Sequence, residues 1–139
     1  MLETLFGGLA SWGPDFLRLG AGVLFVAHGY PKLFGHPPGL RTLAQYLRSM
    51  GIPLPIFMAT LVGIVEFGGG ACLLLGFLTR LAALAIEFAV IIFKVKWSKG
   101  FFAEKGGWEW EGVMLMILLS LLVTGPGHLA LDHRIHTGI

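Results

Sequence analysis

The stretch from Ile56 to Phe77 places one carboxylate inside a long apolar segment. It covers about 22 residues, enough for a helix to cross the ~30 Å hydrocarbon core of a bilayer at ~1.5 Å per residue. Glu66 lies near its middle. An ionised side chain at mid-bilayer costs at least ~2.5 kcal/mol, so it must turn inward and find a cation, a hydrogen-bond partner, a proton or a ligand. The rest of the chain has to supply that partner.

Small residues surround this acid. The residues one turn away on its own helical face are glycines: Gly63, Gly69 and Gly70. A neighbouring helix can therefore approach closely beside Glu66. A second set of small residues recurs every four positions on the flank: Gly68, Cys72 and Gly76. Such a ladder is typical of membrane helices packed backbone to backbone, so the helix is predicted to contact neighbours on two sides.

The whole chain has the composition of a membrane protein. Of 139 residues, 55% are hydrophobic and 13% are charged, whereas a soluble domain is nearer a quarter charged. The apolar residues fall into four blocks, which predict transmembrane helices over residues 15–34, 56–77, 80–97 and 108–123. We therefore expect an all-α, polytopic membrane protein with a single domain over residues 1–139. Its fold would be an antiparallel four-helix transmembrane bundle.

The connections between these blocks predict how the chain lies in the membrane. An amphipathic segment over residues 40–50 suits a short interfacial helix within the first long loop. The residues before Pro14 include no Lys or Arg, so the first block is expected to remain as a membrane helix. The cations of the long loops predict that both loops face the cytoplasm and both termini lie outside an inner cell membrane. These cations are Arg41, Arg48, Lys96, Lys99 and Lys105.

Several function classes are disfavoured by residue type and spacing. The basic residues are dispersed, so nucleic acid is not an expected partner. A single cysteine allows neither an intramolecular disulfide nor a CxxC redox pair. No ligand pair has metal-binding spacing within a span, so no metal site is predicted. The histidines near the C-terminus are interpreted as a solvated tail: His128, His133 and His136.

Polar residues within the predicted spans gather on helical stripes. In the first span Arg18, Gly29 and Lys32 share one face, with His28 at its edge, and Pro31 is expected to kink or end this helix near Tyr30. Glu109 lies on the more polar side of the fourth span. In the third span three charged residues recur every seven positions: Arg80, Glu87 and Lys94. The sequence therefore predicts charged groups turned toward the bundle interior.

Two of these acids create an electrostatic problem. Glu87 falls at a depth like that of Glu66, and two carboxylates at one level repel unless a proton or a cation sits between them. A polar pocket inside apolar walls could hold a quinone headgroup or another small amphipathic ligand. The alternative is structural, in which these groups satisfy one another as buried pairs that specify helix order. The candidate pocket residues are His28, Lys32, Glu66, Glu109, Arg18, Glu87 and Lys94.

Four motifs resemble the DoxX family of small four-helix membrane proteins. They are LRLGAGVLFVAHGYPKLFG, LVGIVEFGGGACLLLGFLTRLAAL, KGFFAEKGGWEWEG and a late GPG, and together they extend from about Leu17 to Asp132. The family pattern falls on charged and small residues: Arg18, His28, Gly29, Lys32, Gly51, Glu66, Gly69, Gly76, Arg80 and Glu109. Glu87 and Lys94 match no family motif and are interpreted as a pair specific to this chain.

The resemblance implies two functional hypotheses and does not decide whether the protein is an enzyme. Some family members are linked to membrane oxidoreductase complexes, which implies a quinone-interacting or accessory subunit with oxidoreductase partner proteins in the lipid bilayer. The other hypothesis is a non-enzymatic carrier of small molecules or a membrane scaffold. No intrinsic cofactor is expected in either case, a quinone is the candidate ligand, and self-association into a homo-oligomer stays open.

Overall fold

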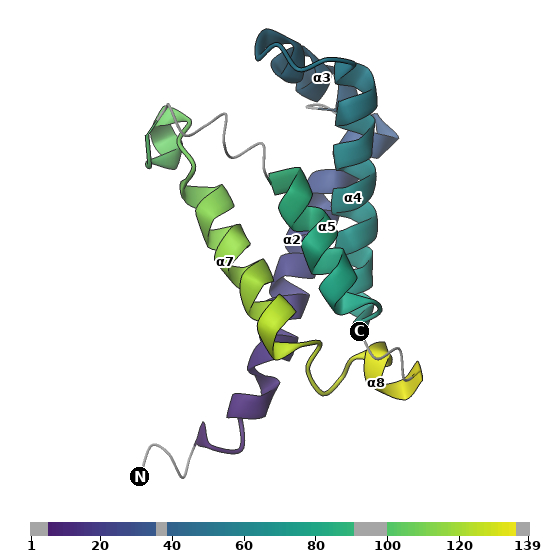
Figure 1. Ribbon diagram of the computed structural model, residues 1–139, viewed down its shortest axis with the longest axis vertical. Coiled ribbons are helices and arrows are strands. Elements are labelled where there is room, and N and C mark those ends of the chain that lie inside the picture. The colour runs from purple at the N-terminus through teal and green to yellow at the C-terminus, as the bar shows by residue number, and fades with distance from the viewer. Residues whose placement is uncertain (1–5, 36–38, 91–99, 136–139) are drawn as a thin grey trace.

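The computed structural model describes residues 6–35, 39–90 and 100–135, and the regular elements within these ranges are all helical. Two shorter helices, α3 (Leu40–Ser49) and α8 (Leu131–Ile135), lie at opposite ends of the molecule, which we term the α3 end and the α8 end (Figure 1). Between these ends four longer helices run alongside one another: α2 (Gly13–Phe34), α4 (Pro55–Leu75), α5 (Thr79–Val90) and α7 (Glu109–Thr124). The 3-10 turns are η1 (Ala10–Trp12) and η3 (Ala103–Lys105).

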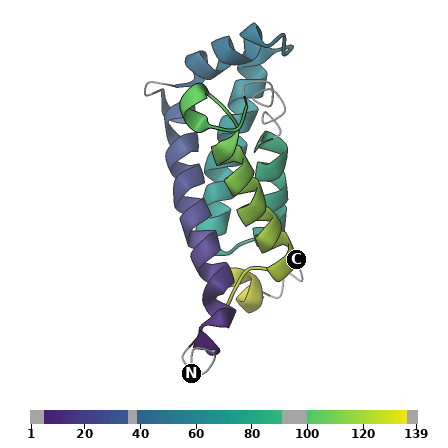
Figure 2. The ribbon, with the colours of Figure 1, turned by 90° about the vertical axis from the view of Figure 1, so that its left-hand side faces the viewer.

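Successive long helices run in opposite directions, as Figures 1 and 2 show. The chain reaches the α3 end through α2, returns through α4, rises again through α5 and descends through α7. These helices cover the ranges predicted from the apolar blocks, except that α5 is described only as far as Val90. The remainder of the predicted third span, residues 91–97, lies outside the described residues.

Proline and glycine set the helix ends. Pro14 and Pro55 occupy the first turns of α2 and α4, where a missing backbone N–H costs nothing. Gly35 and Gly76 end the same helices with φ of 79° and 65°, a left-handed conformation that favours glycine. The prediction that Pro31 ends the first helix near Tyr30 is wrong, because α2 continues to Phe34.

Glycines bring α2 and α4 into direct backbone contact. A Cβ added to Gly70 would lie 2.7 Å from the backbone nitrogen of Val26, and one added to Gly29 would lie 2.8 Å from Phe67 Cα. Real Cβ atoms do not approach so closely, so only glycine fits at either position. On the opposite flank, Gly69 lies against Ile86 of α5. The prediction that the glycines near Glu66 admit a close neighbouring helix is confirmed.

The ladder of small residues does not act as predicted. An added Cβ at Gly68 would meet no atom within 4 Å, so no helix packs against that position. Gly76 ends α4 and lies against Ala130, which precedes α8. The spacing of four residues is real, but the closest helix contacts use the neighbouring face that carries Gly63 and Gly70.

The core lies where the four long helices meet. Ile86, Leu118 and Leu121 are fully buried there. A second, smaller apolar cluster joins α3 to α4, in which Ala44 and Leu47 pack with Ala59. The amphipathic helix predicted over residues 40–50 is therefore α3, and its apolar face contacts α4 rather than standing free.

Within the described ranges, one helix is long and apolar enough to cross a membrane by length and composition: α4, Pro55–Leu75. Helix α2 has 22 residues but includes Asp15, Arg18 and Lys32. Helix α7 has 16 residues, and α5 has 12 described residues. Among the described helices, α4 alone therefore combines this length with so few charged residues.

We expect the substitution Gly70→Ala to lower the free energy of unfolding by about 1–3 kcal/mol, because the new methyl group would force the α2 and α4 backbones apart. Thermal unfolding of the detergent-purified variant, followed by circular dichroism, measures this loss. Gly68→Ala is the matched control and should cause no loss, because its methyl group enters open space. Equal stability of the two variants would contradict a close α2–α4 contact.

Candidate functional site

Glu66 finds its partner on the neighbouring helix. Lys32 Nζ of α2 forms an ion pair and hydrogen bond with Glu66 Oε2 of α4, and their side chains are 20% and 14% exposed. Gly63, one turn before the acid, lies beside the Lys32 side chain, where an added Cβ would be 3.2 Å from Lys32 Cβ. The glycine therefore makes room for the lysine stem. Of the candidate residues, the structure joins these two directly.

Glu87 of α5 lies at the same level as Glu66. Gly69 of α4 contacts Ile86 and the Ala82 carbonyl of the antiparallel α5. Glu66 of α4 lies three residues, or ~4.5 Å, nearer to the α3 end than this contact. About three residues in the same direction along α5 lies Glu87. The equal depth predicted for the two acids is consistent with this helix register.

Glu87 shares the α5 face that turns toward α7. Arg80, seven residues earlier and thus on nearly the same stripe, donates from Nε to the Leu122 carbonyl of α7 at 3.0 Å. From this contact, Glu87 is seven residues further along α5 and Leu115 is seven residues back along the antiparallel α7, so Glu87 lies at about the level of Leu115. Oε1 of Glu87 is buried and, within the described part of the chain, has no hydrogen-bond partner. Lys94, its predicted partner, lies outside the described residues.

Two other candidates occupy places that differ from the prediction. His28 is exposed, although it lies one turn from Lys32. Its position on the stripe edge turns it away from α4, so it does not join the ion pair. Glu109 Oε2 accepts a hydrogen bond from the Ala103 backbone nitrogen at 3.1 Å. This acid therefore ties η3 to the start of α7 rather than reaching Glu66.

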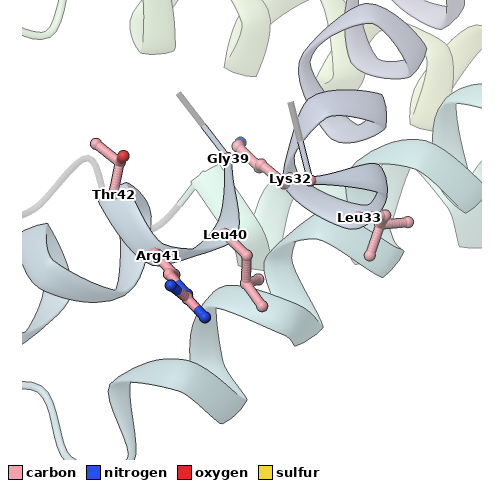
Figure 3. Close-up of a pocket in the computed structure, with 7 residues that line it drawn as sticks. Lys32, Leu33, Gly39, Leu40, Arg41 and Thr42 are labelled. Atoms are coloured by element: carbon pink, nitrogen blue, oxygen red, sulfur yellow. The ribbon is translucent and has the colours of Figure 1, made fainter. Parts of the chain in front are cut away.

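A pocket of about 510 Å³ lies at the α3 end, between the last turn of α2 and the start of α3. Figure 3 shows Lys32 and Leu33 on one side of it and the first residues of α3 on the other. Glu66 does not line this pocket; Lys32 belongs to both places. The described lining residues are Lys32, Leu33, Gly35, Gly39, Leu40, Arg41 and Thr42. The pocket thus combines cationic and apolar side chains.

Arg18, another of the candidate residues, belongs to a separate cluster at the α8 end. Its Nη1 donates to the carbonyls of Leu73 and Leu74, both at 2.7 Å, and its Nε donates to the Pro126 carbonyl at 3.0 Å. Nη2 binds Asp15 Oδ1 at 3.0 Å. Arg18 is 1% exposed. The arginine therefore joins the end of α4 to the segment after α7.

The segment after α7 is docked, which the sequence did not predict. Asp15 accepts hydrogen bonds from the backbone nitrogens of His128 and Leu129, at 2.8 and 3.1 Å. Asp132 of α8 is 5% exposed and accepts from the backbone nitrogens of Leu78 and Thr79, at 2.7 and 2.9 Å. It thereby caps the start of α5 from outside that helix.

The terminal histidines were interpreted as a solvated tail. The side chains of His128 and His133 are exposed, but the His128 ring lies 5.9 Å from the Trp12 ring and Ala130 between the two histidines is 1% exposed. His136 lies outside the described residues.

The i, i+3 spacing of Asp15 and Arg18 was the available sequence signal for their ion pair. Arg18 and Asp15 also bind backbone atoms of residues 126–129. The side chains of these residues gave no indication of those contacts.

The geometry can now be compared with known proteins. A family model described as DoxX matches residues 13–97, more than half of the chain, including α2, α4 and the described part of α5. The chain belongs to the DoxX family. Both members of the Lys32–Glu66 pair lie inside the matched region. Family membership confirms the resemblance inferred from the sequence motifs.

Curated relatives cover most of the chain. It is 34% identical to an uncharacterized membrane protein of Mycobacterium tuberculosis over 86% of this chain and 78% of the relative. It is 30% identical to a Bacillus subtilis protein named "Putative oxidoreductase CatD" over 91% and 89%. It is 30% identical to the inner membrane protein YqjF of Escherichia coli over 82% and 85%. These names support a membrane location for this DoxX protein. No solved structure matches the chain significantly.

We expect Lys32→Met to destabilise this DoxX protein by about 3–5 kcal/mol, because it leaves the Glu66 carboxylate largely buried without its cation. The double variant Lys32→Met/Glu66→Met should recover much of the loss, since it removes both charges. Thermal unfolding of the wild type and the variants in detergent measures the coupling. Additive losses in the double variant would show that the ion pair contributes nothing.

The α8 end gives an independent prediction. Asp15→Ala removes the carboxylate partner of the buried Arg18 and the acceptor of two backbone N–H groups, so a loss of about 3–5 kcal/mol is expected. The released segment after α7 should also become sensitive to limited proteolysis near residues 126–130. Arg134→Ala, at an exposed position of α8, serves as the control and should change stability by less than about 0.5 kcal/mol. An Asp15→Ala protein as stable and protease-resistant as the control would refute the docking role.

Proposed function

We propose that this DoxX protein is a four-helix inner-membrane protein that binds a quinone headgroup beside Lys32 and acts as an accessory subunit of a membrane oxidoreductase system. The name given to the Bacillus subtilis relative supports the oxidoreductase association. The chemistry proposed for the site depends on the charged groups of this chain. Electrons would come from a partner oxidoreductase, since the chain offers no cysteine pair.

The helix arrangement supports a transmembrane bundle. At ~1.5 Å per residue, the 22 residues of α2 span ~33 Å and the 16 residues of α7 span ~24 Å. Charges on α2 do not oppose this placement, because Asp15, Arg18 and Lys32 are all paired inside the protein. The exposed Arg41 and Arg48 at the α3 end support a cytoplasmic position for that end.

The proposal rests on Lys32, which belongs both to the ion pair and to the lining of the pocket. Its ammonium group pairs with Glu66 between α2 and α4, and its side chain also lines the pocket at the α3 end. A lysine ammonium has three N–H donors, so it can bind Glu66 and still donate to a ligand carbonyl oxygen. Leu33 and Leu40 provide apolar surface beside it for a ring and the start of an isoprenoid tail.

Glu66 fixes the position of Lys32 in this proposal. A carboxylate held against an ammonium group is ionised, so it accepts hydrogen bonds and has no proton to give. The Lys32 ammonium group therefore binds the quinone oxygen by donating a hydrogen bond, and the proton that reduction of the quinone requires comes from another group. The ligand class is therefore one with a carbonyl acceptor on an apolar ring.

The direct ion pair also supports a second candidate, a non-enzymatic carrier or scaffold. Lys32 and Glu66 satisfy each other without a ligand, and such pairs can fix which helices become neighbours. In this case the exchange of either residue would reduce solute flux or partner capture and would leave redox turnover unchanged. The two candidates differ in whether a quinone stabilises the isolated protein.

We expect ubiquinone or menaquinone analogues to raise the thermal stability of the detergent-purified wild type in a saturable way, by about 2.7 kcal/mol at one hundred times the Kd. Glu66→Gln should abolish this stabilisation, because it removes the anion that orients Lys32. Glu104→Gln, which removes an exposed acid from η3, is the control and should respond like the wild type.

Absence of a ligand shift in the wild type would contradict the quinone proposal. If Glu66→Gln is then strongly destabilised while the control is not, the ion pair is structural and the carrier or scaffold role gains support. Equal saturable shifts in the wild type and Glu66→Gln would place the quinone away from this pair.

A further inference from the structure

Glu87 is a partly buried acid that the proposed function does not use. Its carboxyl group lies at the level of the Lys32–Glu66 pair, as the contact between Gly69 and Ile86 sets the register of α4 and α5. Oε1 of Glu87 is shielded from solvent and has no hydrogen-bond partner within the described residues. A carboxyl oxygen in this state requires an explanation, because buried polar atoms are normally satisfied.

Among the described residues, the charged groups near the level of Glu87 provide it with no counter-ion. Lys32 of α2 is paired with Glu66 of α4, which stands level with Glu87 and adds a like charge. Arg80, on its own helix, lies two turns toward the α8 end and donates from Nε to the Leu122 carbonyl. The charged side chains that α7 contributes at the α3 end are further acids: Glu109 and Glu111.

The surroundings of Glu87 disfavour an ionised state. An unpaired carboxylate is unfavourable in an apolar medium, and a second carboxylate at the same depth increases the cost. A proton resolves both problems, because the neutral acid neither repels Glu66 nor requires a cation.

We propose that Glu87 holds a proton at neutral pH while Glu66 is ionised against Lys32. The three groups then form a polar layer with one ammonium, one carboxylate and one carboxylic acid, and its net charge is zero. The layer can lose one proton, from Glu87 Oε, when a cationic group approaches or the Lys32–Glu66 pair rearranges. The three side chains together form a site between the helices that binds and releases one proton.

The protonated state of Glu87 is inferred from the geometry of this chain. The role of that proton in the reaction rests on the proposed function. Beside a reduced quinone, Glu87 would be the group that gives up the proton: its O–H bond breaks, a ligand O–H bond forms, and the carboxylate remains. Reprotonation from water on one side of the membrane restores it. Glu66 would keep the lysine in place during this transfer.

The test is infrared absorption of the ligand-free protein in lipid vesicles at neutral pH. A protonated carboxylic acid has a C=O stretching band separate from carboxylate and amide bands, and it moves to lower frequency in deuterated buffer. We expect this band in the wild type and its loss in Glu87→Gln. The control Glu104→Gln, at an exposed and hydrated position, should retain it.

Stability gives a second readout of the same inference. Glutamine has the shape of a neutral glutamic acid, so Glu87→Gln should unfold at the wild-type temperature. A wild type without the band, or a band that survives in Glu87→Gln, would overturn the inference. So would a large loss of stability in Glu87→Gln, which would indicate an ionised and paired carboxylate. Because no quinone is present, the band can be found even if quinone binding fails, and the two proposals are thereby separated.

Discussion

The close backbone contact between α2 and α4 is what allows the central charges of this protein to pair. Gly29 and Gly70 remove the side chains that would hold the two backbones apart. Lys32 can then reach across to Glu66, and neither charge is left unpaired in an apolar environment. The ion pair and the glycines depend on each other, because a wider spacing would separate the charges. The position of the pocket follows from the same contact, since Lys32 lines it from the last turns of α2.

The two ends of the molecule use their cations differently. Arg18, at the α8 end, donates to three backbone carbonyls and to Asp15, so its guanidinium is committed to the protein. This end is closed by Asp132, which caps α5. Lys32, near the α3 end, has a single described partner and adjoins a pocket. A cation with spare donors at an open end suits ligand binding, whereas a saturated one suits structural support.

The candidate residues predicted from the sequence divide between these two ends of the molecule. Periodicity placed Arg18 and Lys32 on one helical face, which is correct, but a shared face does not mean a shared site. They lie 14 residues apart, about 21 Å along α2, and therefore serve opposite ends. His28 and Glu109 also lie on predicted polar stripes, yet one is exposed and the other binds the Ala103 backbone nitrogen. A helical stripe predicts which face of the helix a side chain occupies, but it does not predict which group that side chain will bind.

The sequence by itself determined the helical class, the approximate helix ranges, the DoxX family and the need of Glu66 for an interior partner. The family follows from the resemblance of four motifs. The other features follow from local causes: apolar blocks, glycine and proline at helix ends, and the cost of a charge in an apolar segment. Only the tertiary structure decided which cation meets Glu66, which small residues touch a neighbour, and that residues 126–132 dock beneath Arg18. The partners in those contacts are 34 to more than 100 residues apart, and many are backbone atoms. Every residue carries the same backbone groups, so no sequence pattern can reveal which of them will be used.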